Sequence, residues 1–513
     1  MTATSSPLEG TSGNRQLPAH VWVGVGLTAL TLLVYWPLLD LALLGWDSWP
    51  MILTARVQDW GDLWGCLTEP LMDGRYPLGE FYRPVTNLFF AIDHSLGGLE
   101  PGAYHRTDLL IHLGNTLLIA CLAARLCVGR AALWAAGCVG VLYCLHPIQL
   151  ELITASPRRA DTLCLLFTLA CLLTQGLPGE GHPRGPRWLG GLLAFLAVGS
   201  KETGAVVLPV VFAWHVCLSS QGQVPLERLR SAAKKSLPVL FGVLALLAVR
   251  TLVLGGLGGP VPLGGEPVGR LELFGTLIER TVLPLPVLGW SHARLPFYAA
   301  GLILMGATWL SLRDVSTRRL PEGAPRMGPV MSFLGLWCLS VFAITGFADQ
   351  MHEWYALLLS APVVLTVGQC MVRMRFPLRA LACPWLMVFP IVSLVVVLRG
   401  WPLESTPRLD AISFLAQQDL TRLEEGVESA DDGTVLRLNP WHPMLAPASD
   451  GSDVRSLFSA FDYGLQAWCE LRWPERTFDV QAWTLEIPQP QPDMLRVQLI
   501  PGPEPGYLNL SPD

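Results

Sequence analysis

The chain has 513 residues, of which 51% are hydrophobic and 15% are charged, and its mean hydropathy is +0.42. This composition excludes an ordinary soluble enzyme and is typical of a protein that crosses a membrane several times. The formal net charge of -6 and the lack of a concentrated basic stretch also exclude nucleic acid as a partner.

Hydrophobic segments recur along the chain at lengths that suit membrane-spanning helices. They predict an α-helical polytopic membrane protein with about eleven transmembrane helices, within a core that covers residues 21–399. In chain order the predicted spans are Val21–Leu44, Tyr104–Ala124, Ala131–His146, Ala160–Gln175, Trp188–Val198, Gly204–Leu218, Leu237–Leu254, Pro296–Leu312, Gly328–Phe347, Trp354–Val372 and Leu381–Leu398.

The connections between these spans alternate in charge. Lys and Arg in short loops remain on the cytoplasmic side of a membrane, and every second connection here is basic. The pattern predicts a cytoplasmic tail over residues 1–20, an uncleaved first span and an extracytoplasmic C-terminus, in a membrane of the bacterial inner-membrane type. The basic residues are Arg125, Arg130, Arg184, Arg187, Arg228, Arg230, Lys234, Lys235, Arg313, Arg318, Arg319, Arg326, Arg373, Arg375 and Arg379.

Three segments are predicted outside the membrane spans. The first outer loop, residues 45–103, and the stretch 271–288 each contain apolar residues at helical spacing, which indicates amphipathic helices on the membrane surface. Residues 400–513 predict a small α/β domain, with helices near 410–427 and 454–471 and strands near 434–438, 477–487 and 494–499. A disulfide between Cys66 and Cys469 stays an alternative to free thiols.

A dense group of ionisable residues lies between His146 and Asp161. The stretch reads HPIQLELITASPRRAD and connects two predicted spans. Ionisable groups at a membrane boundary are costly to place, so they usually serve a function. We therefore expect polar chemistry at one face of the membrane.

Several fragments follow one another in a characteristic order: WDSW, YRP, YHRTDLLIHLGN, HPIQLE, RRAD, SKETG and HEWYALLLS. Together they resemble the multi-spanning, GT-C type glycosyltransferases that use polyprenyl-phosphate sugars, most closely protein O-mannosyltransferases with transmembrane and tetratricopeptide regions. The resemblance covers roughly Ala42–Leu365. Three departures stand out. Ser48 replaces the second of two paired acids, Trp354 stands where the family has arginine, and no tetratricopeptide array follows, which leaves the acceptor open among protein, lipid and glycan.

Asp47 is the candidate catalytic base. Transfer to a hydroxyl acceptor needs a group that removes the hydroxyl proton. Asp47 follows the first span directly, and the resemblance implies that it matches the family's catalytic aspartate. The alternative is that Asp47 only caps a short surface helix.

Cationic side chains are needed to hold the phosphate leaving group. The candidates are Arg83, Arg158, Arg159, Lys201 and Arg250. The alternative roles are structural pairs of Arg83 with Glu80, of Arg159 with Asp161 and of Lys201 with Glu202. For Arg250, which falls inside an apolar run, the alternative is that it only reaches outward to the membrane interface.

A further set of polar residues has supporting candidate roles: His105, His112, His146, Glu151, Asp161, Glu202, Glu353 and Tyr355. His105, His112 and Asn115 share one helix face, where hydrogen bonds between helices explain them equally well. His146 and Glu151 match no strong metal pattern, so no metal and no other cofactor is predicted.

The sequence thus predicts an inverting glycosyltransferase that moves a sugar, with mannose as the first candidate, from a polyprenyl-monophosphate carrier to an acceptor outside the membrane. The competing interpretation is a transporter or lipid-carrier flippase, against which no inverted repeat appears in the sequence. A structural subunit would leave the ordered charged fragments unexplained. The enzyme interpretation requires that these residues meet at one site: Asp47, Arg159, Lys201 and Arg250.

Overall fold

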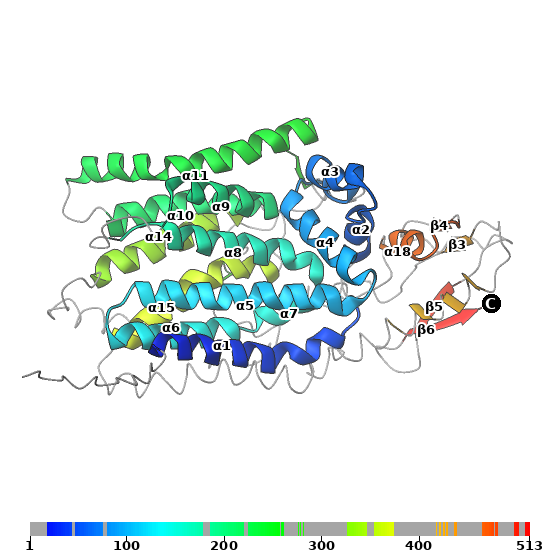
Figure 1. Ribbon diagram of the computed structural model, residues 1–513, viewed down its shortest axis with the longest axis horizontal. Helices are drawn as coiled ribbons and strands as arrows, with labels where there is room; N and C mark the ends of the chain where they lie inside the picture. Colours follow the sequence, from blue (N-terminus) through cyan, green and yellow to red (C-terminus); the bar gives the residue numbers. More distant parts are fainter. Residues whose placement is uncertain are drawn as a thin grey trace, which may run out of the picture.

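The computed structural model describes residues 18–43, 47–74, 79–177, 185–219, 224–256, 258–260, 326–345 and 353–373, together with isolated positions near 275–281 and short pieces of the tail between 417 and 512. Within these ranges the chain is mostly helical. The longer helices run side by side in one bundle, and short helices cover one of its ends (Figure 1).

Six helical segments of the described chain are long and apolar enough to cross a membrane, which makes the protein an integral membrane protein. A seventh is obtained if Arg130–Cys144 and Ile148–Thr154, which meet at 60°, count as one broken span. The six are Ala19–Asp40, Pro101–Arg125, Glu202–Ser219, Pro225–Leu254, Met327–Thr345 and Ala356–Arg373.

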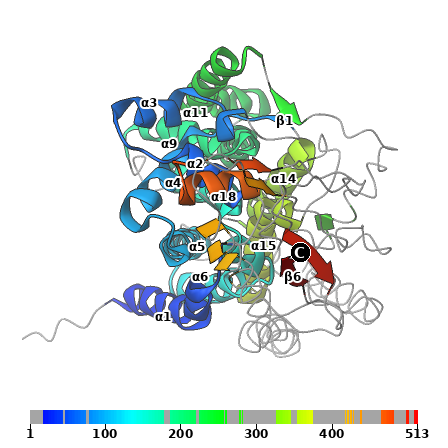
Figure 2. The ribbon, with the colours of Figure 1, turned by 90° about the vertical axis from the view of Figure 1, so that its right-hand side faces the viewer.

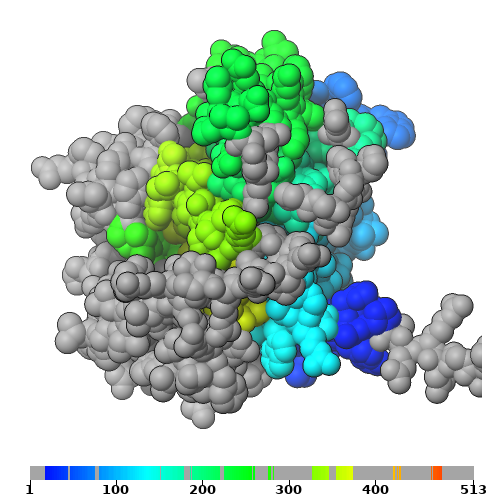
Figure 3. Space-filling model, turned by 90° about the vertical axis from the view of Figure 1, so that its left-hand side faces the viewer, coloured from blue at the N-terminus to red at the C-terminus, as the bar shows by residue number. Residues whose placement is uncertain are grey.

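The bundle is built from helices that alternate in direction. Its members are α1 (Ala19–Tyr35) with η1 (Trp36–Asp40), α5 (Pro101–Arg125), α6 (Arg130–Cys144), α7 (Ile148–Thr154), η3 (Ser156–Arg158), α8 (Arg159–Thr174), α9 (Arg187–Ser200), η4 (Glu202–Val206), α10 (Val207–Trp214), η5 (His215–Ser219), α11 (Pro225–Leu254), α14 (Met327–Thr345), η7 (Glu353–Tyr355) and α15 (Ala356–Arg373). The N-terminal end of α11 and the turn between α5 and α6 lie at the end of the bundle that Figure 3 shows.

Most predicted spans coincide with one of these helices. The predicted spans Pro296–Leu312 and Leu381–Leu398 lie outside the described residues, as does most of the stretch 271–288. One boundary differs clearly, because α11 begins at Pro225 and not at Leu237. Proline is favoured in the first turn of a helix, where its missing N–H has no partner to lose, so the helix extends through the basic residues that were expected in a loop.

Glycines allow α9 and α11 to approach closely. A Cβ atom on Gly242 would lie only 2.0 Å from the carbonyl oxygen of Gly191, and one on Gly191 would lie 2.5 Å from that of Pro238. Small residues at a helix contact are a usual means of packing in membranes. This contact brings the backbones of α9 and α11 close together.

Short helices cover that end: α2 (Ser48–Thr54), α3 (Trp60–Thr68), η2 (Leu71–Gly74) and α4 (Pro84–Gly97). Strand β1 (Gly79–Glu80) pairs antiparallel with β2 (Gly259–Pro260), which joins the first outer loop to the chain after α11. The predicted amphipathic helix is α4, whose Phe90 is buried while Ile92 and Leu96 are exposed. Figure 2 views this end directly.

Part of the tail packs on the same end. Helix α18 (Gly464–Arg472) lies against α2, with the rings of Trp49 and Trp468 edge to face at 6.4 Å. Strand β3 (Leu436–Leu438) pairs in parallel with β4 (Phe478–Val480), and β5 (Val497–Pro501) pairs antiparallel with β6 (Leu508–Pro512). Cys66 and Cys469 are both buried free thiols, so the disulfide between them is not formed.

Candidate functional site

Asp47 lies at the start of α2, where the chain passes from the bundle into the first outer loop. It occupies the N-cap position, yet its side chain forms no capping hydrogen bond. The side chain of Asp47 therefore does not cap α2 in this structure. The residue is partly buried, and the cations that act most strongly on its charge are Arg158, Arg83 and Lys201.

The surroundings of Asp47 change its acidity. Burial raises the pKa of its carboxyl above the usual range, while the positive charges of Arg158, Arg83 and Lys201 partly oppose this rise. A carboxylate with a raised pKa accepts a proton more readily than an exposed aspartate does. The carboxyl of Asp47 therefore titrates at a higher pH than that of an exposed aspartate.

Two ion pairs bring distant segments together beside Asp47. Arg83 donates two hydrogen bonds to Glu202, from Nε to Oε2 at 3.1 Å and from Nη2 to Oε1 at 2.6 Å. Lys201 Nζ lies 2.7 Å and 2.8 Å from the carboxylate oxygens of Asp161. Arg250 Nη1 lies 3.9 Å from Glu202 Oε2. The first outer loop and helices α8, α9 and α11 therefore meet at one point.

The partners differ from those expected for purely structural pairs. Arg83 pairs with Glu202 and not with Glu80, and Lys201 pairs with Asp161 and not with Glu202. Arg250 is only 5% exposed, so it does not reach out to the interface. Glu202 joins Arg83 and Arg250, because it is the carboxylate that both approach.

The turn η7 supplies two neighbouring aromatic rings to the same place. The guanidinium carbon of Arg158 lies 3.2 Å from the ring centroid of Trp354, and Lys201 Nζ lies 5.1 Å from that of Tyr355. Burial, together with the negative charges of Asp161 and Glu202, raises the pKa of Tyr355 to about 12. The phenol of Tyr355 is therefore neutral at physiological pH.

We call this assembly the charged cluster. It consists of Asp47, Arg83, Arg158, Asp161, Lys201, Glu202 and Arg250. Arg158 differs from the other cations, since no carboxylate in the described part of the chain forms an ion pair with it. Its Nε is buried and forms no hydrogen bond within those ranges, although the residue as a whole is partly exposed.

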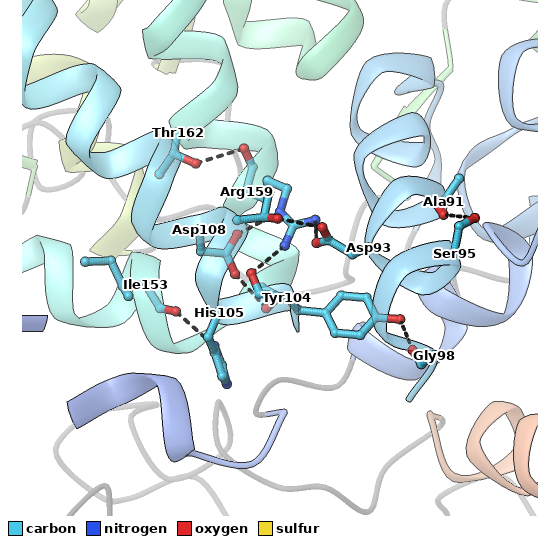
Figure 4. Close-up of polar contacts among 12 residues, drawn as sticks. Ala91, Asp93, Ser95, Gly98, Tyr104, His105, Asp108, Ile153, Arg159 and Thr162 are labelled. Atoms are coloured by element: carbon cyan, nitrogen blue, oxygen red, sulfur yellow. Dashed lines mark hydrogen bonds and ion pairs between the residues drawn. The ribbon is translucent and has the colours of Figure 1, made fainter. Parts of the chain in front are cut away.

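Arg159 lies apart from the charged cluster, in the bundle interior (Figure 4). Its Nε lies 2.7 Å from Asp108 Oδ1, its Nη1 lies 2.6 Å from Asp93 Oδ2, and its Nη2 donates to the Tyr104 carbonyl at 2.9 Å. Its guanidinium also faces the Phe90 ring, and the side chain has no exposed surface. These contacts use the N–H groups of the guanidinium. Among the predicted phosphate ligands, Arg159 is therefore the one whose contacts indicate a structural role.

Asp93 and Asp108 were not among the candidates from the sequence. Asp108 lies inside the fragment YHRTDLLIHLGN, where an acid in an apolar helix requires a partner. Ser156 Oγ donates to Asp108 Oδ2 at 2.7 Å, and Thr107 Oγ1 donates to Asp93 Oδ1 at 2.5 Å. The two buried carboxylates are thus held by hydroxyls as well as by Arg159.

The histidines lie among helix contacts. The ring nitrogens of His105 lie 3.3 Å and 3.2 Å from the carbonyl oxygens of Ile153 and Ala42. His112 stacks on Tyr143 with ring centroids 5.8 Å apart. Both histidines are buried in the interior, away from the charged cluster.

Two further candidates contact backbone carbonyl oxygens of other helices. Asn115 Nδ2 donates to the Thr162 carbonyl at 2.9 Å, and His146 Nε2 lies 2.8 Å from the Thr281 carbonyl. The side chains of Glu151 and Glu353 lie outside the described residues. No group of three His, Cys, Asp or Glu side chains arranged for a metal ion occurs among the residues the structure describes.

Curated proteins with similar sequences are protein O-mannosyltransferases. A 166-residue match to Protein O-mannosyl-transferase TMTC2 of Homo sapiens is 30% identical and covers 30% of this chain and 19% of that protein. A 149-residue match to Protein O-mannosyl-transferase TMTC4 of Homo sapiens is 32% identical and covers 25% and 20%. The resemblance inferred from the ordered fragments is confirmed. The chain spans about a fifth of the length of these relatives.

No family model matches the chain. Among solved structures, ArnT from Cupriavidus metallidurans bound to undecaprenyl phosphate gives a TM-score of 0.45 at 13% identity, over 80% of this chain and 73% of that one. The oligosaccharyltransferase AglB from Archaeoglobus fulgidus gives 0.48 at 12% identity, over 90% and 64%. This agreement is too low to match single residues between the structures.

Proposed function

We propose that the protein transfers a sugar from a polyprenyl-monophosphate carrier to a hydroxyl acceptor at the membrane surface. The observation that carries this proposal is the meeting of Asp47 with Arg83, Arg158 and Lys201 at one end of a membrane bundle. The curated relatives are named protein O-mannosyl-transferases, which favours mannose as the sugar and a protein as the acceptor.

In the proposed reaction Asp47 accepts the proton of the acceptor hydroxyl. The hydroxyl oxygen attacks the anomeric carbon of the sugar on the side opposite the phosphate, and the bond from that carbon to the phosphate oxygen breaks. The leaving group is the polyprenyl phosphate, and attack from the opposite side inverts the anomeric configuration. Cations near the leaving oxygen stabilise the charge that develops on it.

The charge of the cluster suits this leaving group. The cations Arg83, Arg158, Lys201 and Arg250 outnumber the carboxylates Asp47, Asp161 and Glu202 by one. A carrier-linked sugar phosphate carries one negative charge and gains more as the bond breaks. Since Arg158 has no carboxylate partner in the described chain, it is the group best suited to meet the phosphate.

The remaining assignments complete the proposal. The core has about eleven spans, with the N-terminus cytoplasmic and the charged cluster on the extracytoplasmic side of a bacterial inner membrane. The tail from residue 400 forms a small extracytoplasmic α/β domain. His105, His112 and His146 keep the helices in register, and Glu151 and Glu353 stay candidates for supporting roles near the site.

The test uses the full chain in proteoliposomes, supplied with labelled polyprenyl-phosphate mannose and extracted acceptors. We expect transfer by the wild type and a loss of about 10²- to 10⁴-fold in Asp47→Asn, because the amide cannot accept the proton. The matched control is Asp73→Asn. Asp73 is an exposed acid in the same outer loop at φ 53°, a conformation that asparagine also tolerates.

Each outcome separates the candidate functions. Transfer that survives Asp47→Asn would move the base elsewhere, with Glu80 and Glu151 as the next candidates. No transfer by the wild type with any hexose donor would overturn the glycosyltransferase proposal and favour the transporter, which a donor-flipping assay then tests.

A further inference from the structure

We infer that Trp354 acts as a positioning residue for Arg158. Its ring fixes the plane of the guanidinium, so that the N–H groups at the guanidinium edge meet the donor phosphate. This inference rests on the proposed function and assigns a residue to its donor site. Four observations carry it: the contact between the two side chains, the burial of Trp354, the lack of a carboxylate partner of Arg158 among the described residues and the neighbouring contact of Tyr355 with Lys201.

The contact between Arg158 and Trp354 is close. The guanidinium carbon lies 3.2 Å from the ring centroid, well within the distance of a cation–π contact, in which a guanidinium can stack on an aromatic face. Trp354 is only 7% exposed, so the ring is itself fixed by its surroundings. Stacking limits the rotation of the guanidinium and leaves the N–H groups at its edge available for hydrogen bonds in one plane.

Arg158 contacts an aromatic ring, whereas the neighbouring cations contact carboxylates. Arg83 is held by Glu202, Lys201 by Asp161 and Arg159 by two aspartates, whereas no carboxylate among the described residues pairs with Arg158. A carboxylate partner would neutralise the guanidinium and compete with a phosphate. An aromatic ring orients the guanidinium and leaves its positive charge unneutralised.

The turn η7 places an aromatic ring against each of two cations. Trp354 and Tyr355 are consecutive, with ring centroids 6.0 Å apart, and each faces one cation of the charged cluster. Among the cations of the charged cluster, only Arg158 has no carboxylate partner within the described ranges, so Trp354 contacts the cation that we propose for the donor. Arg158 also directly precedes α8, where the backbone N–H groups add a partial positive charge.

The experiment measures binding of undecaprenyl phosphate to the purified full chain in detergent micelles. We expect Trp354→Leu to weaken binding roughly three- to thirtyfold, the range that follows from the strength of a desolvated cation–π contact. Trp354→Phe keeps a ring face and should stay close to the wild type. The matched control is Trp134→Leu, which removes a tryptophan that is 68% exposed on α6.

A double-mutant cycle with Arg158→Gln shows whether Trp354 acts through Arg158. If it does, Trp354→Leu should cause no further loss in the Arg158→Gln background, whereas losses that multiply would overturn the inference. Arg158→Lys tests the same contact without changing the Trp354 ring. It keeps the charge but removes the stacked plane, and it should weaken binding about as much as Trp354→Leu.

The two proposals fail in different ways. Wild-type binding that Trp354→Leu leaves unchanged would overturn the positioning role and leave the proposed function standing. Wild-type protein that does not bind undecaprenyl phosphate, and also transfers no sugar, would overturn both.

Discussion

Two adjacent arginines have opposite environments. Arg158 is partly exposed, faces an aromatic ring and lacks a carboxylate among the described residues, while Arg159 is fully buried between Asp93 and Asp108. The direction of each side chain at the start of α8 decides this difference. Arg158 is therefore the arginine that we propose for the donor phosphate, and Arg159 holds α4, α5 and α8 together.

The stability of the protein should separate these two roles. Arg159→Gln leaves two buried carboxylates without their cation, so we expect it to lower the free energy of unfolding by about 3–5 kcal/mol. Arg158→Gln removes no ion pair to another described residue and should change that quantity by less than about 1 kcal/mol. Thermal or denaturant unfolding in micelles measures both. Equal losses from the two substitutions would contradict the structural role of Arg159.

The raised pKa of Asp47 predicts how the rate depends on pH. Asp47 must be ionised to accept a proton, so the rate should fall as the pH drops through its pKa, at a higher pH than an ordinary aspartate would require. Because the charge of Arg158 lowers this pKa, Arg158→Gln should raise it and move the acidic limb of kcat to higher pH. The measurement is kcat against pH at saturating donor.

The control for the pH profile is Arg106→Gln. Arg106 is an exposed arginine near the start of α5, and its charge is not among those that act on Asp47. The acidic limb of the kcat–pH profile should stay at the same pH in Arg106→Gln. A shift toward lower pH in Arg158→Gln would show that a different group controls the rate.

At the scale of elements, the tail contributes to the environment of the predicted base. Helix α18 packs on α2, the helix that begins directly after Asp47, and Trp49 and Trp468 share one apolar core with Met51 and Ile52. Segments more than four hundred residues apart thus form one unit. The position of Asp47 depends on α2, so it also depends on α18.

Removal of the Trp468 side chain should loosen α2. We expect Trp468→Ala to cost about 3–5 kcal/mol locally, as for other buried tryptophans, and to speed amide hydrogen exchange over Ser48–Thr54. Arg472→Ala is the control. It breaks an ion pair between side chains that are 44% and 33% exposed, which contributes about 0–1 kcal/mol at most. Unchanged exchange in α2 after Trp468→Ala would contradict the coupling.

At the scale of the whole molecule, the described helices alternate so that the charged cluster and the basic turns lie at opposite ends of the bundle. The turn between α5 and α6 and the start of α11 are at one end, and α2, which begins directly after Asp47, is at the other (Figure 1). By the positive-inside rule, this arrangement supports the proposed extracytoplasmic position of the charged cluster.

Labelling of introduced cysteines tests this orientation. In intact spheroplasts, a membrane-impermeant maleimide should label Thr68→Cys in the outer loop and not Arg130→Cys at the opposite end; both positions are exposed. The parent chain, which has its own twelve cysteines, gives the background. Permeabilised cells should label both variants, and the reverse pattern in intact cells would place the charged cluster inside.

The sequence by itself determined the class of protein, the course of most described spans and the polar fragments that form the site. Hydropathy and the alternation of basic loops are local properties, so they can be read along the chain without knowledge of packing. The ordered fragments likewise identified the resemblance to protein O-mannosyltransferases. Asp47, Arg83, Arg158, Lys201 and Arg250 could therefore be chosen as candidates before any contact was known.

Only the tertiary structure decided which charges pair with which. Arg83 with Glu202 and Lys201 with Asp161 join residues on different helices, and the burial of Arg159 depends on how α4, α5 and α8 pack. The contact of α18 with α2 arises in the same way. Partners of this kind are set by which helix faces meet in the bundle, and neither periodicity nor composition within one segment determines that.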